Sequence, residues 1–365
     1  MAEFIKGIDL CEGFFNDIAK PIITSNYPDL LYSAGLIGYG SDVLGYDDIT
    51  STDHMWGPRF YLFLRNEDIH IADDIMNLFS REFPYTYKGY SVNFSKPDQN
   101  DNGIRHGEFI THGLVNPLVF IYTFESFIEK YIGKFPMMGF DEYDWLSFSE
   151  NRLLCLTAGR IFVDLLNVEM IRNMLTYYPK DVWLYLIASQ WAIIAEEQAF
   201  VKRCSDCDDE LGSNIVCMRI IERIMRLCFL YSKKYAPYSK WFGTAFKKLD
   251  TNCDIKTELE LASNAICIIE RENHLISALM YVGMLHNQSG ITEEIELKVS
   301  NYYGRSIKVI YADKFADATR EKLKGSLFES MPLIGTMSQT GSLCSLYDNP
   351  NKGFKSINML YRNLK

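Results

Sequence analysis

The chain has 365 residues, which is long for one domain and favours two. Hydrophobic residues make up 48% and charged residues 23%, proportions that suit a globular protein with a large core and argue against intrinsic disorder. The formal net charge of −10 disfavours a broad nucleic-acid-binding surface but leaves room for a small basic cleft.

The first third of the chain mixes helical and strand patterns. Apolar side chains at three-to-four spacing predict helices over 9–25 and 69–83. Residues 30–39 are expected to end as a strand, and apolar or aromatic-rich runs predict further strands over 59–64, 87–94 and 104–111. The polar stretch between the last two is expected to be a turn or hairpin loop.

After about residue 115 the pattern becomes helical. The clearest helix is predicted over 181–203, with Asp181 as its N-cap, and others over 213–233 and 256–283. Glycines, a proline and acidic residues cluster around 133–145 and suggest a domain boundary. The expected fold class is therefore α+β: a domain over 1–135 with a small mixed sheet and helices, then a larger, mainly helical domain over 136–365.

Cysteine usage and hydropathy point to a cytoplasmic protein. Many of the nine cysteines lie in apolar runs, as reduced, buried thiols do. Cys204 and Cys207 form a close pair, but no second pair or His pair lies nearby, so a surface turn is favoured over a metal site. The longest apolar stretch, 182–195, is shorter than the roughly 20 residues of a membrane span. The first residues show no secretory-signal pattern.

The most informative segment is 38–59. It is not a dinucleotide-binding fingerprint, because Val43 stands where the third glycine belongs and no βαβ unit follows. A predicted strand ends at Gly40 and Ser41, and Asp53 follows just before the next buried strand. Phosphoryl transfer needs backbone donors and a hydroxyl near a triphosphate, and carboxylates that hold Mg²⁺. The Gly-Ser turn could supply the first and Asp53 the second.

This pattern resembles the nucleotidyltransferase superfamily with the polymerase-beta-like fold, whose signature is Gly-Ser, a spacer, Asp-x-Asp/Glu and a third carboxylate on a later strand. The run 40–59 and the stretches 157–162, 177–184, 209–213 and 235–246 look like an uncharacterised bacterial domain family of that superfamily. The resemblance covers most of the chain. It implies a nucleoside triphosphate at Gly40 and Ser41, and Mg²⁺ or Mn²⁺ on Asp53 and Glu108.

The sequence departs from the superfamily pattern at Met55, which occupies the position of the second carboxylate. A thioether is a poor ligand for a hard cation, and Asp42, Asp47 or Asp48 could replace it only if the loop folds back. Two functions therefore stay open. One is transfer of a nucleotidyl group from the triphosphate to an acceptor hydroxyl. The other is a catalytically impaired nucleotide-binding or protein-interaction module.

Other candidate residues carry two interpretations each. Ser41 could instead cap a helix, Asp53 could be a turn carboxylate, and Glu108 could face solvent from a strand. Arg59 closes the informative segment and is a further candidate nucleotide contact.

In the run 235–246, Lys240 would contact phosphate oxygens while Tyr238 or Trp241 stacks on a base; the alternative is a packed interhelical loop. In antibiotic-modifying nucleotidyltransferases, the helical domain supplies a carboxylate base for the acceptor hydroxyl. Glu197 is the main candidate here, beside Glu196 and Asp209, although most acids on helix faces are only solvated. The acceptor, which could be a small molecule, a protein or a tRNA end, cannot be identified from the sequence.

Overall fold

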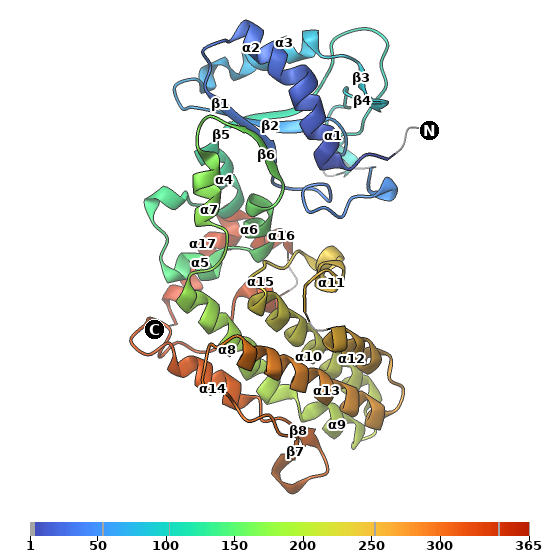
Figure 1. Ribbon diagram of the computed structural model, residues 1–365, viewed down its shortest axis with the longest axis vertical. Coiled ribbons are helices and arrows are strands. Elements are labelled where there is room, and N and C mark those ends of the chain that lie inside the picture. The colour runs from blue at the N-terminus through green and yellow to red at the C-terminus, as the bar shows by residue number, and fades with distance from the viewer. Residues whose placement is uncertain (1–3, 53–54, 102, 252, 342–343, 365) are drawn as a thin grey trace. The chain divides into compact units, whose positions relative to one another are not determined.

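A computed structural model describes residues 4–52, 55–101, 103–251, 253–341 and 344–364 (Figure 1). The chain forms two compact units. Unit 1 contains residues 1–139 and 152–176, and unit 2 contains 140–151 and 177–365. The chain therefore crosses between units three times, whereas the sequence predicted a single division at residue 135. The reason is that a strand from the later segment completes the sheet of unit 1.

Unit 1 is built on a four-stranded mixed sheet in the order β5–β2–β1–β6. Its strands are β1 (Tyr32–Leu36), β2 (Arg59–Leu64), β5 (Leu118–Thr123) and β6 (Arg160–Asp164). β1 pairs antiparallel with β2 and with β6, while β2 pairs parallel with β5. β1 has a neighbouring strand on each side, and all five of its residues are buried.

Helices cover both faces of this sheet (Figure 1). On one face, Phe60, Leu62 and Leu64 of β2 join a core with apolar side chains of α1 (Gly7–Phe14), α2 (Lys20–Asn26) and α3 (Ala72–Glu82). On the other face, the rings of Tyr61 and Phe63 lie 4.9 and 5.2 Å from that of Phe127 in α4 (Phe124–Ile132). A strand covered on both sides is apolar at nearly every position, which explains the unbroken hydrophobic run of β2.

The two helices predicted in the first third are confirmed. A π-helical turn, Phe15–Ala19, joins α1 to α2, so the expected helix over 9–25 is continuous from Gly7 to Asn26. The helix expected over 69–83 begins with a 3₁₀ turn, Ile69–Ile71, and continues as α3. In both cases the apolar face with helical spacing packs on the sheet.

The strands predicted over 87–94 and 104–111 are largely wrong. The first region forms only a short hairpin of β3 (Thr86–Tyr87) and β4 (Tyr90–Ser91). The second is irregular, with isolated bridges from Ile104 to Asp98 and from Gly107 to Phe94. Side chains and backbone groups in this region satisfy one another locally. For example, Arg105 donates to the carbonyl oxygens of Ser95, Asn116 and Pro117.

The chain enters and leaves unit 2 through short segments. α5 (Glu142–Ser147) lies in unit 2, and α6 (Glu150–Thr157) begins in unit 2 and ends in unit 1. After β6, α7 (Val168–Met174) completes unit 1. The bulk of unit 2 then follows, and its other elements are α8 (Lys180–Glu197), α9 (Phe200–Ser205), α10 (Glu210–Tyr231), α11 (Ser239–Lys247), α12 (Cys253–Asn264), α13 (Ile268–Gln288), β7 (Ser300–Asn301), β8 (Lys308–Val309), α14 (Asp313–Glu321), α15 (Met337–Thr340), α16 (Cys344–Tyr347) and α17 (Lys355–Arg362).

The core of unit 2 forms around α8, which packs against α10 and α14. The Trp191 ring stacks on Phe315 of α14 at 4.4 Å, and Tyr185 stacks on Phe328 at 4.7 Å. The helix predicted over 213–233 is confirmed as α10 with shifted ends, and the one predicted over 181–203 is confirmed as α8, followed by the short α9. The single helix predicted over 256–283 is wrong, because this region forms two helices, α12 and α13, that pack against each other. Pro179, not Asp181, occupies the N-cap position of α8, and Asp181 lies in the first turn, where a carboxylate also favours the helix dipole.

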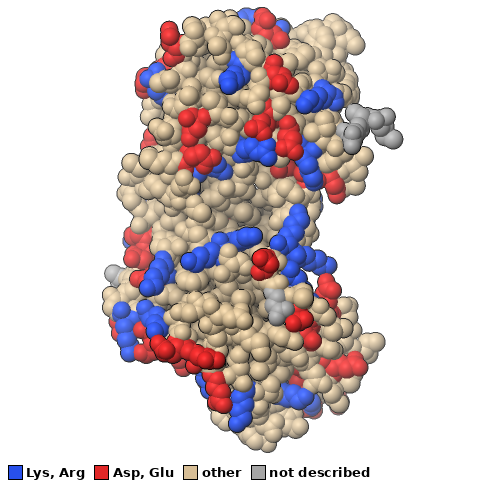
Figure 2. All heavy atoms as spheres, viewed as in Figure 1, with Lys and Arg blue, Asp and Glu red and all other residues tan. Residues whose placement is uncertain are grey.

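On the face drawn in Figure 2, acidic and basic side chains are interspersed in both units, and the visible basic groups form no continuous basic surface. This distribution fits a chain with 37 basic and 47 acidic residues. None of the helices in the described part of the chain has the length and apolar character needed to cross a bilayer.

Candidate functional site

The loop that follows β1 has a backbone that only glycine allows at one position. Gly40 has φ +127°, a conformation that L side chains rarely adopt. A Cβ atom at this position would lie 2.1 Å from Oδ1 of Asp42 and 2.5 Å from Nη2 of Arg59. The loop then turns back on itself, as the amides of Leu44 and Tyr46 donate to the carbonyl oxygens of Gly40 and Ser41. Gly40 therefore permits a close approach between this loop and β2.

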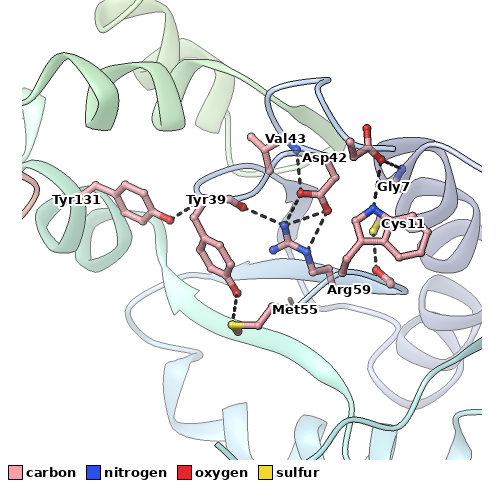
Figure 3. A network of polar contacts seen from close by, with 11 residues as sticks. Gly7, Cys11, Tyr39, Asp42, Val43, Met55, Arg59 and Tyr131 are labelled. Atoms are coloured by element: carbon pink, nitrogen blue, oxygen red, sulfur yellow. Dashed lines mark hydrogen bonds and ion pairs between the residues drawn. The ribbon is translucent and has the colours of Figure 1, made fainter. Parts of the chain in front are cut away.

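A buried ion pair holds the loop against the first residue of β2 (Figure 3). Arg59 Nη2 lies 2.8 Å from Asp42 Oδ1, Nε lies 3.2 Å from Oδ2, and the two side chains are 1% and 2% exposed. Nη2 also donates to the carbonyl oxygen of Tyr39 at 2.9 Å. Burial is the largest single influence and lowers the pKa of Arg59, but Asp42, Tyr39 and Cys11 together outweigh it, so the pKa is raised.

Tyr39 covers this pair and connects it to the rest of unit 1. Its ring centroid lies 4.9 Å from the Arg59 guanidinium carbon, and its amide donates to the Tyr131 hydroxyl at 3.1 Å. Its own hydroxyl contacts the sulfur of Met55 at 3.5 Å (Figure 3). Met55 has φ +49°, an uncommon conformation for a non-glycine residue. One guanidinium thus contacts both a carboxylate and an aromatic face.

Asp47 fixes the far end of the loop on α1. Its Oδ2 accepts hydrogen bonds from the Gly7 amide at 2.6 Å and from Trp56 Nε1 at 3.2 Å, and its side chain is 1% exposed. The carboxylate lies at the N-terminus of α1, where the helix dipole favours negative charge. Close to it, Cys11 donates to the Gly57 carbonyl oxygen, and burial followed by the charge of Asp42 raises the pKa of this thiol to about 12.

Among the residues that the structure describes, three consecutive amides in the loop have no hydrogen-bond acceptor. The N–H groups of Gly40, Ser41 and Asp42 donate no hydrogen bond to any residue that the structure describes. The neighbouring amides on both sides are bonded, since Tyr39 donates to Tyr131 and Val43 to Asp42 Oδ1. Backbone N–H groups that make no bond within the described residues are available as donors to an anion.

The described carboxylates do not fit a two-metal site. Asp42 is bound to Arg59 and Asp47 to the start of α1, and Asp48 caps the 3₁₀ turn Ile49–Ser51 by accepting from the amides of Thr50 and Ser51. Among the described residues, no group of three or more His, Cys, Asp or Glu side chains could hold a metal ion. Asp53, the first predicted ligand, lies outside the described residues.

Glu108, the other predicted ligand, is not on a strand of the sheet. It lies in the irregular segment after Gly107, and its side chain is exposed. Its backbone accounts for its position, because its amide donates to Asn93 and its carbonyl accepts from Ser91 Oγ and Asn93 Nδ2. The prediction that Glu108 lies on a strand is therefore wrong. Its role as a metal ligand has no support among the described groups.

The remaining predicted site residues lie in unit 2. Glu197 ends α8 and forms an ion pair with Arg219, so its role as a base stays a prediction. Tyr238 lies next to the start of α11 and lines a cavity. Lys240 is exposed, and its ammonium lies 5.0 Å from the ring centroid of Trp241.

Sequence reasoning found the loop but not its internal pairing. It treated Arg59 as a nucleotide contact and Asp42 as a substitute metal ligand, whereas the two side chains neutralise each other inside unit 1. It did not single out Tyr39 at all. One sequence feature could have indicated this ion pair. Arg59 is the first residue of an otherwise apolar strand, and a buried arginine needs a carboxylate partner.

The chain shows limited similarity to known proteins. A family described as a domain of unknown function, DUF4037, matches residues 145–242, which lie mainly in unit 2. A crystal structure of a nucleotidyltransferase-like protein from Exiguobacterium sibiricum 255-15 matches with 11% identity and a TM-score of 0.33, covering 80% of this chain and 82% of that chain. A similarity at this TM-score does not establish a shared fold. No curated protein matches the chain.

Proposed function

We propose that this chain is a nucleotidyltransferase-like protein that binds the phosphates of a nucleoside triphosphate at Gly40–Asp42 and transfers a nucleotidyl group to an acceptor hydroxyl. The observation that carries the proposal is the row of three amides without a described acceptor, on a loop fixed by Arg59 and Asp47. Gly40 and Ser41 are half-buried, so a ligand can reach this loop from solvent, and phosphate oxygens are strong acceptors. The half-buried Ser41 supplies a hydroxyl beside them.

Phosphate binding is tested with Ser41→Ala. The variant removes one hydroxyl but keeps all three amides, so the dissociation constant for a non-hydrolysable triphosphate should rise about fivefold to tenfold in calorimetry, the effect of one hydrogen bond. The melting temperature should not change. Ser25→Ala, at an exposed position of α2, is the matched control and should bind like the wild type. Equal affinity of all three proteins would contradict the assignment of Ser41.

Lys240 is tested in the same way. Sequence reasoning assigns its ammonium to the phosphates and Tyr238 or Trp241 to the base. Because Lys240 is exposed, Lys240→Ala should leave the melting temperature unchanged and weaken triphosphate binding. Lys234→Ala, exposed in the same unit, is the control. If Lys240→Ala binds like the control, Lys240 does not belong to the site.

A second candidate function is nucleotide binding without transfer. It is favoured by the placement of Glu108 outside the sheet and by the commitment of Asp42, Asp47 and Asp48 to other contacts. An assay with a triphosphate labelled at the α-phosphate distinguishes the two candidate functions. Transfer predicts that label becomes attached to an acceptor and that Asp53→Asn abolishes this reaction while binding persists. Binding alone predicts no labelled acceptor in either protein.

A further inference from the structure

Unit 2 contains a cavity of about 330 Å³. Its walls come from the start of α6, the middle of α10, the start of α11 and the C-terminal segment around Asp348. All of these segments belong to unit 2, and all except the C-terminal one fall within the residues that match DUF4037. A cavity of this size is at the lower end of the range for small organic ligands.

One arginine in the cavity wall faces two carboxylates. Arg226 binds Oε1 of Glu222 through Nη2 at 2.8 Å and Nε at 3.0 Å. Its Nη1 lies 3.6 Å from Oε2 of Glu150, a distance beyond a hydrogen bond. The guanidinium is therefore committed mainly to Glu222. The charge of Glu150 is only partly balanced.

Glu150 is buried in the cavity wall. Its residue is 4% exposed, and its Oε1 accepts the Ala236 amide at 3.0 Å. Within the described part of the chain, Oε2 has no hydrogen bond and only the distant contact with Arg226. Burial raises the pKa of Glu150, and the nearby Arg226 charge counteracts this. A buried carboxylate with one weakly paired oxygen is best stabilised by an added cation.

The rest of the lining combines one more acid with apolar groups. Asp348 is a third carboxylate in the wall, and it accepts hydrogen bonds from Ser149 and Asn151. The Phe242 ring lies 5.0 Å from the Arg226 guanidinium carbon, and methionine side chains of α10 complete the apolar part. The lining therefore contains three carboxylates, one guanidinium and an aromatic ring.

We propose that this cavity binds a small organic cation, an amine with an apolar or aromatic body, whose ammonium group meets Glu150 while its body packs on Phe242 and the methionines of α10. The charge of the lining selects a cation over an anion, and the aromatic ring and thioethers select an organic cation over a metal ion. The inference does not rest on the proposed nucleotide function, because its argument uses Glu150, Arg226 and Phe242. Of the residues predicted to contact the nucleotide, Tyr238 lines this cavity, whereas Lys240 and Trp241 do not.

The charge preference is tested with three ligands of nearly equal shape: 2-phenylethylamine, 2-phenylethanol and phenylacetate. Ligand-observed NMR titration of the full chain measures the dissociation constant of each. The amine should bind with saturation, the alcohol at least about tenfold more weakly, and phenylacetate not at all. Equal binding of amine and alcohol, a preference for phenylacetate, or no saturable binding of the amine up to about 10 mM overturns the proposal.

Variants of lining residues test whether the amine binds in this cavity. Glu150→Gln keeps the shape and removes the charge, and should weaken amine binding about tenfold. Should this buried variant fold poorly, Glu222→Gln tests the same charge at a position that is 39% exposed and should weaken binding about threefold. Glu260→Gln removes an exposed carboxylate of unit 2 outside the cavity and is the matched control. Equal amine affinity in Glu222→Gln and Glu260→Gln places the amine elsewhere and refutes the assignment.

Discussion

Asp42 and Arg59 form a buried ion pair, with Oδ1 and Nη2 2.8 Å apart and both side chains almost completely excluded from solvent. The pair connects the loop after β1 to the start of β2. Because two charges inside unit 1 are stable only together, this contact determines the path of the loop that carries the amides of Gly40, Ser41 and Asp42. The candidate site and the stability of unit 1 therefore depend on the same two residues.

Breaking this pair should destabilise the protein strongly. Arg59→Met leaves the Asp42 carboxylate buried without its partner, so the free energy of unfolding in urea should fall by about 3–5 kcal/mol. The double variant Asp42→Leu with Arg59→Met removes both charges and should recover part of this loss. Arg160→Met, which breaks partly exposed ion pairs with Asp9 and Glu12, should cost about 1 kcal/mol or less. Similar losses for Arg59→Met and Arg160→Met would contradict the importance of burial.

Gly40 and Gly45 both have positive φ, but only Gly40 is closely packed. Gly40→Ala places a Cβ 2.1 Å from Asp42 Oδ1, so it should reduce the free energy of unfolding by about 2–4 kcal/mol and weaken triphosphate binding. Among the described residues, a Cβ at Gly45 would lie within 4 Å of no other atom, so Gly45→Ala should cost only about 1 kcal/mol, from the backbone conformation. Urea denaturation and calorimetry of the two variants make the comparison. Equal losses in both would show that steric contact with Asp42 is unimportant.

His286 should make unit 2 sensitive to mild acid. Its imidazole is fully buried, with Nδ1 2.8 Å from the Tyr231 oxygen and Nε2 2.9 Å from Thr292 Oγ1. Burial lowers its pKa from 6.5 to about 4. Between these values the unfolded chain takes up a proton that the folded protein does not, so the free energy of unfolding falls as the pH falls. The maximum loss is about 3 kcal/mol.

Melting curves at pH 7, 6 and 5 measure this effect. Stability should decline from about pH 6.5 downward in the wild type, and less steeply in His286→Gln, which has no imidazole to protonate. His112→Gln, at an exposed position, should follow the wild type. Identical pH profiles for the wild type and His286→Gln would exclude His286 as the source.

Local pattern was sufficient for the long helices and for β2. The three-to-four spacing in 9–25 and 69–83 identified helices because one face of each packs on the sheet, and the apolar run 59–64 identified a strand covered on both sides. The edge strands β5 and β6 were not predicted, because an edge strand forms by pairing with a segment distant in sequence, which the local pattern does not show. The strand predicted over 104–111 is wrong for the converse reason: in the described residues this segment forms only isolated bridges, and local composition does not show whether a strand has a partner.

The sequence by itself determined that a glycine-serine turn follows a buried strand, because backbone freedom and apolar burial are local properties. Tertiary structure alone decided which charges are available in that turn. Asp42, Asp47 and Arg59 look like free ligands along the chain, yet each is neutralised or bonded by a group 17 to 40 residues away. A buried charge is stable only next to a partner. The fold, and not the spacing of residues along the sequence, determines which partner is close.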